Sequence, residues 1–123
     1  MKLRIRGDSI RLRLTQTEVK KLAEDGRIED VTRFGPDERF TYAIAFGGSS
    51  LTAKLESRGI EITVPGEVAR AWATSADSIG IEGARDLGDG KTLRILVEKD
   101  FACLTERPHE DDADAFPNPS SSC

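Results

Sequence analysis

The chain has 123 residues, of which 37% are hydrophobic and 33% are charged, and its formal net charge is -4. This size predicts one domain with a single modest core, and no apolar run approaches the roughly 20 residues that cross a bilayer. The N-terminal residues alternate charged and apolar side chains and only two cysteines are present, so we expect no signal peptide and no disulfide framework, and we expect a cytoplasmic protein without a membrane partner.

The first predicted element is a hairpin whose strands alternate polar and apolar residues. Leu3 and Ile5 share one face of the first strand, and the run 10–14 places three apolar residues on one face of the second. This period of two indicates half-buried strands, and the glycine, aspartate and serine at 7–9 indicate the turn between them. The opposite face is cationic, with a serine at the turn, and consists of Arg4, Arg6, Ser9, Arg11 and Arg13.

A helix and a second hairpin are predicted next. Thr15 occupies the position of an N-cap, and Glu18 follows three residues later as its partner in a capping box. Apolar residues at 19, 22 and 23 form one stripe, and Gly26 ends the helix. Strands over 28–34 and 40–46, joined by a turn at 35–38, complete a unit of two strands, a helix and two strands.

The second half of the chain repeats this order of elements. Strands are predicted around 51–55 and 60–64, then a helix beginning at Pro65, then strands around 79–81 and 93–97 with a turn at 86–90. The alternating run 60–64 follows 10–14 at an offset of fifty positions, while an offset of 49 aligns the helix stripes and 53 aligns the last strands. We therefore predict an internal duplication, with repeats at 1–47 and 50–99 that bury their apolar faces on each other about an approximate dyad.

These elements predict a mainly β, β-rich α+β fold. We expect a pseudo-two-fold barrel made of two ββαββ units, forming one domain over residues 1–99. The segment 100–123 is a C-terminal extension with one arginine against six acidic residues. The negative net charge therefore lies in this acidic tail, whereas the first half of the chain carries a slight basic excess.

The run 7–14 with the helix that carries Glu18, and the run 60–68 with its strand, proline and helix, resemble the AbrB/MazE-like swapped-hairpin regulators and antitoxins. In that family two ββαββ units interlock and the first hairpin docks on DNA, so the resemblance implies both for this chain, with Ser9 and Arg13 on matching positions. In antitoxins of this kind an acidic tail wraps a partner protein. The whole chain, with its segments 99–103 and 116–119, also resembles a family of small bacterial proteins of unknown function, which implies no activity.

The leading functional hypothesis is a non-enzymatic interaction module that contacts a protein through its tail or through the cationic hairpin. Asp100, Phe101 and Phe116 are the tail residues expected to make contact, either with a partner or with the chain's own core. No nucleophile–base pair and no phosphate-cradling glycine spacing is evident. We therefore expect neither an enzymatic activity nor an organic cofactor.

The second hypothesis is DNA binding by the cationic hairpin, whose phosphate contacts would weaken with salt. A two-fold DNA site is not expected, because the second repeat does not preserve the arginines. At the equivalent positions it carries Lys54, Glu56, Glu61 and Thr63.

The third hypothesis is a metal site in the acidic tail. Zinc and related transition metals accept thiolate, imidazole and carboxylate ligands together, and the tail offers all three types. The candidate ligands are Cys103, His109, Asp111 and Asp112.

Overall fold

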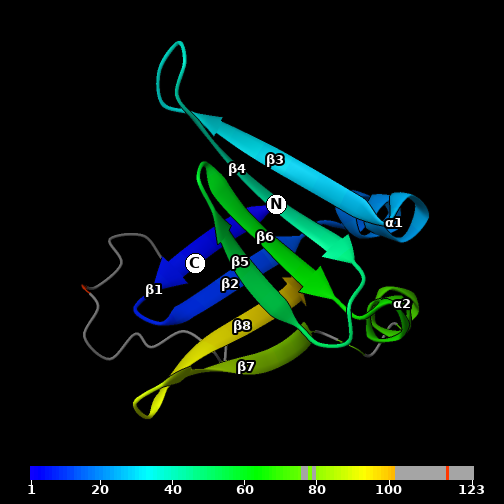
Figure 1. Ribbon diagram of the computed structural model, residues 1–123. Coiled ribbons are helices and arrows are strands. Elements are labelled where there is room, and N and C mark those ends of the chain that lie inside the picture. The colour runs from blue at the N-terminus through cyan, green and yellow to red at the C-terminus, as the bar shows by residue number, and fades with distance from the viewer. Residues whose placement is uncertain (76–77, 79, 102–115, 117–123) are drawn as a thin grey trace.

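The computed structural model describes residues 1–75, 78, 80–101 and 116 (Figure 1). Within these residues, two strands, a helix and two strands occur twice in succession, which confirms the predicted pair of ββαββ units. The first unit consists of β1 (Lys2–Arg6), β2 (Ser9–Leu14), α1 (Gln16–Asp25), β3 (Arg27–Arg33) and β4 (Arg39–Phe46). The second consists of β5 (Thr52–Glu56), β6 (Gly59–Val64), α2 (Gly66–Thr74), β7 (Gly80–Gly88) and β8 (Lys91–Lys99).

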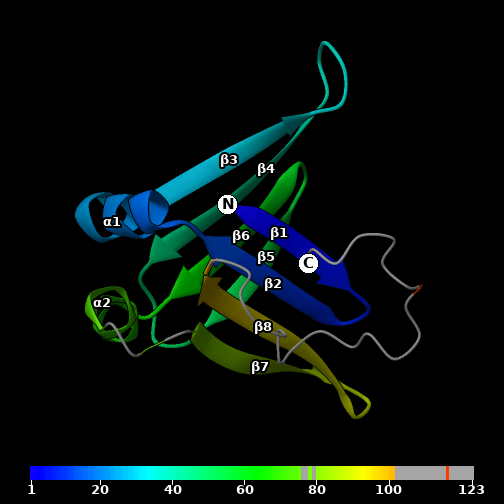
Figure 2. The same ribbon diagram turned by 180° about the vertical axis from the view of Figure 1, so that it is seen from behind.

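The strands form two four-stranded sheets, and each sheet combines one hairpin from each unit. The first sheet has the order β1-β2-β8-β7 and the second β3-β4-β6-β5. The two units join through parallel pairs, β2 with β8 and β4 with β6. Figures 1 and 2 show α1 and α2 at the same end of the two sheets. The units therefore pair with each other as predicted, but the described strands remain in two separate sheets in place of the expected closed barrel.

The pairing registers of the two sheets are equivalent. Leu12 lies beside Val97 in the first sheet, and Ile62 lies beside Ile44 in the second. The step from residue 12 to 62 is 50 positions, and the step from 44 to 97 is 53. The extra residues therefore fall between α2 and β7, so that the insertion leaves both strand registers unchanged.

The helices follow the 50-residue offset as well, so the predicted offset of 49 is wrong. The buried residues Val19 and Leu22 of α1 correspond to Ala69 and Trp72 of α2. Val68, which we expected in the apolar stripe, is 46% exposed. The error arises because alanine and valine are both apolar, and a short stripe shifted by one residue fits the pattern almost equally well.

A single apolar core lies between the sheets and beneath the helices, and both units contribute to it. Burying such side chains supplies most of the favourable free energy of folding. Because the parallel pairs bring the two units into one core, neither unit has a core of its own. The least exposed large side chains of this shared core are those of Leu12, Leu14, Leu22, Ile44, Ile62, Val64, Ile95 and Val97.

Neither α1 nor α2, the helices within the described residues, has the length and apolar character of a membrane-spanning segment.

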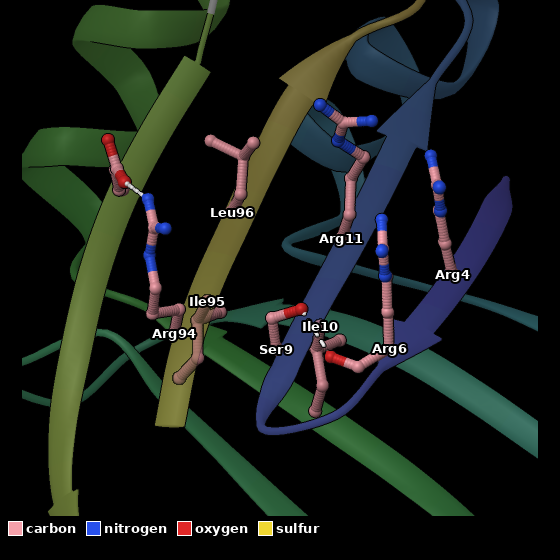
Figure 3. A pocket seen from close by; sticks show the side chains of 9 residues that line it. Arg4, Arg6, Ser9, Ile10, Arg11, Arg94, Ile95 and Leu96 are labelled. Carbon is pink, nitrogen blue, oxygen red and sulfur yellow. Dashed lines mark hydrogen bonds and ion pairs between the residues drawn. The ribbon is translucent and has the colours of Figure 1, made fainter. Parts of the chain in front are cut away.

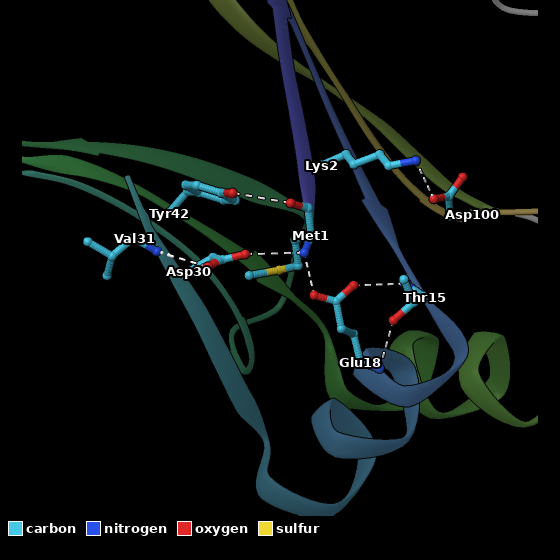
Figure 4. A network of polar contacts seen from close by, with 8 residues as sticks. All are labelled: Met1, Lys2, Thr15, Glu18, Asp30, Val31, Tyr42 and Asp100. Carbon is cyan, nitrogen blue, oxygen red and sulfur yellow. Dashed lines mark hydrogen bonds and ion pairs between the residues drawn. The ribbon is translucent and has the colours of Figure 1, made fainter. Parts of the chain in front are cut away.

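Polar contacts join the edge strand β1 to the second sheet (Figure 4). The α-amino group of Met1 contacts the carboxylates of Glu18 and Asp30, the latter at 3.3 Å, and the hydroxyl of Tyr42 donates to the Met1 carbonyl oxygen at 3.1 Å. Glu18 also completes the predicted capping box with Thr15. Burial by itself raises the pKa of Glu18, but hydrogen bonds from the α-amino group and from Thr15 outweigh it, so the pKa lies below its ordinary value.

At the opposite edge the join is apolar. Leu51, fifty positions after Met1, packs on β7, where a Cβ at Gly83 would lie 2.8 Å from the Leu51 Cδ2 atom. The Met1 and Leu51 side chains both pack against the core, and the edge at Met1 additionally has the polar contacts of its α-amino group and carbonyl oxygen.

Replacement of Glu18 by glutamine is expected to lower the free energy of unfolding at neutral pH by about 1–3 kcal/mol, because a part-buried amine loses a charged acceptor. Because the pKa of Glu18 is lower in the folded than in the unfolded state, its carboxylate stabilises the fold fully above about pH 4.3, the pKa of glutamate in the unfolded chain. This stabilisation is lost as the pH falls through the lower pKa of Glu18 in the folded state. Urea unfolding across the acid range should show a flatter pH dependence in the variant. Glu24→Gln, an exposed change on the same helix, is the control, and equal losses in both would contradict this role.

Replacement of Gly59 by alanine is expected to destabilise the fold by about 3 kcal/mol. A Cβ at Gly59 would lie 1.8 Å from the carbonyl oxygen of Thr41, in the parallel pair that joins the units. Gly66→Ala is the control, because its Cβ would meet only the Arg70 guanidinium at 3.5 Å. That change should be neutral or stabilise by about 0.5 kcal/mol. Thermal unfolding monitored by circular dichroism compares the two, and equal stability would refute the predicted clash.

Candidate interface on the outer face of the first sheet

Strand alternation and hairpin pairing bring the predicted basic residues together on the outer face of the first sheet. Leu12 and Leu14 point into the core, so the intervening Arg11 and Arg13 belong to the opposite face. The antiparallel register places Arg4 directly beside Arg11. Figure 3 shows Arg4, Arg6 and Arg11 extending in the same direction from neighbouring strands. We call this surface the cationic face; its basic members are Lys2, Arg4, Arg6, Arg11, Arg13 and Arg94.

Sequence reasoning missed the part of this face that β8 supplies. The parallel register sets Ser9 beside Arg94 and Arg13 beside Glu98. Arg94 donates to Glu82 of β7 at 2.6 Å. The alternation in β8 does place 94, 96 and 98 on one face, but only the long-range pairing with β2 shows which surface that face extends.

One carboxylate binds two guanidinium groups at the centre of the face. The Nε atoms of Arg11 and Arg13 lie 3.1 and 2.7 Å from Oε1 of Glu98. These three side chains are only 11%, 14% and 9% exposed. Charges so little hydrated are stable only with good partners.

A shallow pocket of about 120 Å³ lies between β1, β2, β8 and β7 on this face. Small-molecule sites generally occupy about 300–1,000 Å³, so this pocket is too small to enclose such a ligand. Ser9, the serine predicted at the turn, donates its hydroxyl to the carbonyl oxygen of Arg6 at 2.7 Å, so it stabilises the turn. The face is suited to contact with an extended surface.

The equivalent face of the second sheet has a different charge. Glu61 occupies the position that corresponds to Arg11, and it accepts a hydrogen bond from Nε of Arg27 at 3.2 Å. Hydrogen bonds from Arg27 to Glu61 and to Glu29 raise the pKa of that guanidinium. The duplication has therefore preserved the strand register but reversed the sign of the charge at this position.

The start of the acidic tail lies next to the cationic face. The amide of Asp100 donates to the carbonyl oxygen of Leu14 at 2.9 Å, and its carboxylate lies 2.8 Å from Nζ of Lys2. Phe101 is 52% exposed and lines a groove beside the helices. Phe116 is 97% exposed, so its side chain is not packed into the core.

The candidate metal ligands Cys103, His109, Asp111 and Asp112 lie outside the described residues, so the metal hypothesis stays a prediction. Within the part of the chain that the structure describes, no group of three or more His, Cys, Asp or Glu side chains is placed to hold a metal ion.

The chain belongs to a family of unknown function, DUF7009, whose model matches residues 1–120. No curated protein and no solved structure matches it. The match covers both units and most of the tail, in agreement with the resemblance that the sequence indicated. The resemblance to AbrB/MazE-like proteins has no matching relative to support it.

Replacement of Glu98 by glutamine is expected to lower the free energy of unfolding by about 2–4 kcal/mol, because two little-exposed guanidinium groups lose their shared counter-charge. Glu82→Gln on the same sheet is the control. Its pair with Arg94 is 51% and 65% exposed, so the cost should stay below about 1 kcal/mol. Urea unfolding of both variants measures the difference, and a Glu98 variant as stable as the control would contradict the role assigned to this carboxylate.

Proposed function

We propose that this member of a family of unknown function is a non-enzymatic binding module whose cationic face takes an acidic segment of a partner polypeptide. The observation that carries the proposal is the gathering of six basic side chains on three adjacent strands, where the same surface holds three carboxylates, Glu82, Asp86 and Glu98. Such an excess of one sign attracts and orients a partner of opposite charge.

The rigidity of the sheet supports this function. The residues directly beneath the face, Leu12, Ile95 and Val97, are at most 1% exposed. Glu98 additionally holds Arg11 and Arg13 in place. Side chains that are ordered before binding lose less conformational entropy when a partner arrives, so more of the interaction energy contributes to affinity.

The spacing and chemistry of the arginines suit an extended acidic peptide. Arg4 and Arg6 are two residues apart on β1, a separation of about 7 Å, which is also the repeat of alternate side chains in an extended peptide. A planar guanidinium group matches a carboxylate with two parallel hydrogen bonds. The contact between Asp100 and Lys2 at 2.8 Å shows that a carboxylate from extended chain fits at one corner of this face.

One feature favours a polypeptide over duplex DNA. The equivalent face of the second sheet carries Glu61 in place of Arg11, so the pseudo-two-fold fold offers no matching second half-site for a duplex.

The proposal predicts that a fluorescein-labelled peptide with alternating glutamates binds the full chain, as measured by fluorescence anisotropy at low salt. Replacing Arg4 and Arg6 together by glutamine should weaken binding at least about tenfold, because two exposed charge-assisted contacts are lost. Higher salt should also weaken it, since charges at an exposed surface are screened.

The matched control removes the same number of charges elsewhere, with Lys54 and Arg39 of the second sheet both changed to glutamine. This control should bind the peptide as the parent chain does. Equal weakening in both double variants would show a net-charge effect and overturn the proposal. A labelled DNA duplex and a peptide with glutamine in place of glutamate complete the comparison, and tighter binding of the duplex would favour the DNA hypothesis instead.

A further inference from the structure

A larger groove lies at the helical end of the molecule, where α1, the end of α2 and the end of β8 meet. Its volume is about 750 Å³, within the range of about 300–1,000 Å³ that is typical of small-molecule sites. Most of its surface is apolar and is supplied by Leu14, Val19, Ala23, Ala73 and Phe101, while the remaining lining residues are polar or charged: Gln16, Lys20, Thr74, Ser75, Lys99 and Asp100. The groove is separate from the cationic face and shares none of its basic residues.

Lys99 places a positive charge in this groove. Its Nζ donates to the carbonyl oxygen of Ser75 at 2.5 Å and lies 5.7 Å from the centroid of the Trp72 ring. Both partners are neutral groups, and within the described residues no carboxylate pairs with Lys99. Asp100, which also lines the groove, has its carboxylate on Lys2. A part-buried ammonium group whose partners among these described residues are all neutral is costly, and an anion in the groove would reduce this cost.

The duplication shows that the fold itself does not require a cation at this position. The amide of Asp100 donates to Leu14, and at the equivalent place the amide of Gly47 donates to Val64. The residue that precedes Gly47, and so corresponds to Lys99, is Phe46, a half-buried ring packed against the core. An apolar side chain therefore satisfies the packing in one unit, whereas the other unit has a lysine over a tryptophan.

We infer that this groove binds a small amphiphilic anion of the monocarboxylate class. The carboxylate contacts the ammonium group of Lys99, and the apolar body lies along Leu14, Val19 and Phe101. Lys20, a second cation on the groove wall, adds to the positive potential at the site. The groove thereby combines apolar walls with a few convergent polar groups, as small-molecule sites do.

The experiment titrates the full chain with decanoate below its micellar range, by calorimetry and by the fluorescence of Trp72, the chain's single tryptophan. We expect saturable binding with one decanoate per chain and a change in Trp72 emission, because the ammonium group above the ring acquires a new partner. Decanol has the same apolar body without the charge, and it should bind at least about tenfold more weakly.

Lys99→Met should abolish the preference for decanoate over decanol while it keeps the apolar walls intact. Lys21→Met, an exposed change on α1 outside the groove, is the matched control and should keep the full preference. Ala73→Phe should weaken both ligands, because the ring fills the groove. Measurements on the parent chain alone can overturn the inference. Either equal affinity for decanoate and decanol or the absence of saturable binding would do so.

Discussion

The parallel pairing of β2 with β8 and of β4 with β6 is the constraint on which the rest of the structure depends. Each pair joins strands from different units, so each sheet contains one hairpin of both halves. The side chains that point inward from these four strands meet in one core, in which Leu12, Ile44, Ile62 and Val97 are almost completely buried. A shift of either register by one residue would turn these side chains outward. In the first sheet, the basic side chains of the cationic face would then point inward.

Comparison of equivalent positions in the two units distinguishes residues that the fold requires from residues that are particular to one unit. Positions that keep an apolar residue in both units, such as 12 and 62, serve the shared core. Three equivalent pairs differ in chemistry: Arg11 and Glu61 on the outer faces, Lys99 and Phe46 at the helical end, and Met1 and Leu51 at the sheet edges. Because the same backbone accepts both members of each pair, the charged members are not demanded by packing. Two of these differences coincide with the two proposed binding sites.

The two proposed sites differ in the physical basis of recognition. The cationic face is a rigid, nearly flat surface on which charge and the spacing along a strand select an extended acidic partner. The groove is a concave apolar space in which one ammonium group orients a small ligand. They lie on different parts of the fold, although Asp100 connects them, since it lines the groove and pairs with Lys2 of the cationic face.

Local patterns in the sequence were sufficient to predict the two ββαββ units, the inward and outward faces of β2, and the basic residues of one hairpin. These patterns are the alternation of polar and apolar residues, the capping box at Thr15 and the turn glycines. They suffice because the predicted properties depend on neighbours along the chain. Two predictions were wrong because the local pattern is weak. The helix offset of 49 residues was wrong because a short apolar stripe fits almost equally well when it is shifted by one residue. The closed barrel was wrong because closure depends on how the edges of the sheets meet in space. Only the tertiary structure placed Arg94 and Glu98 beside the first hairpin and Lys99 over Trp72. Strand pairing and packing bring together residues more than 20 positions apart, and no local pattern in the sequence contains that information.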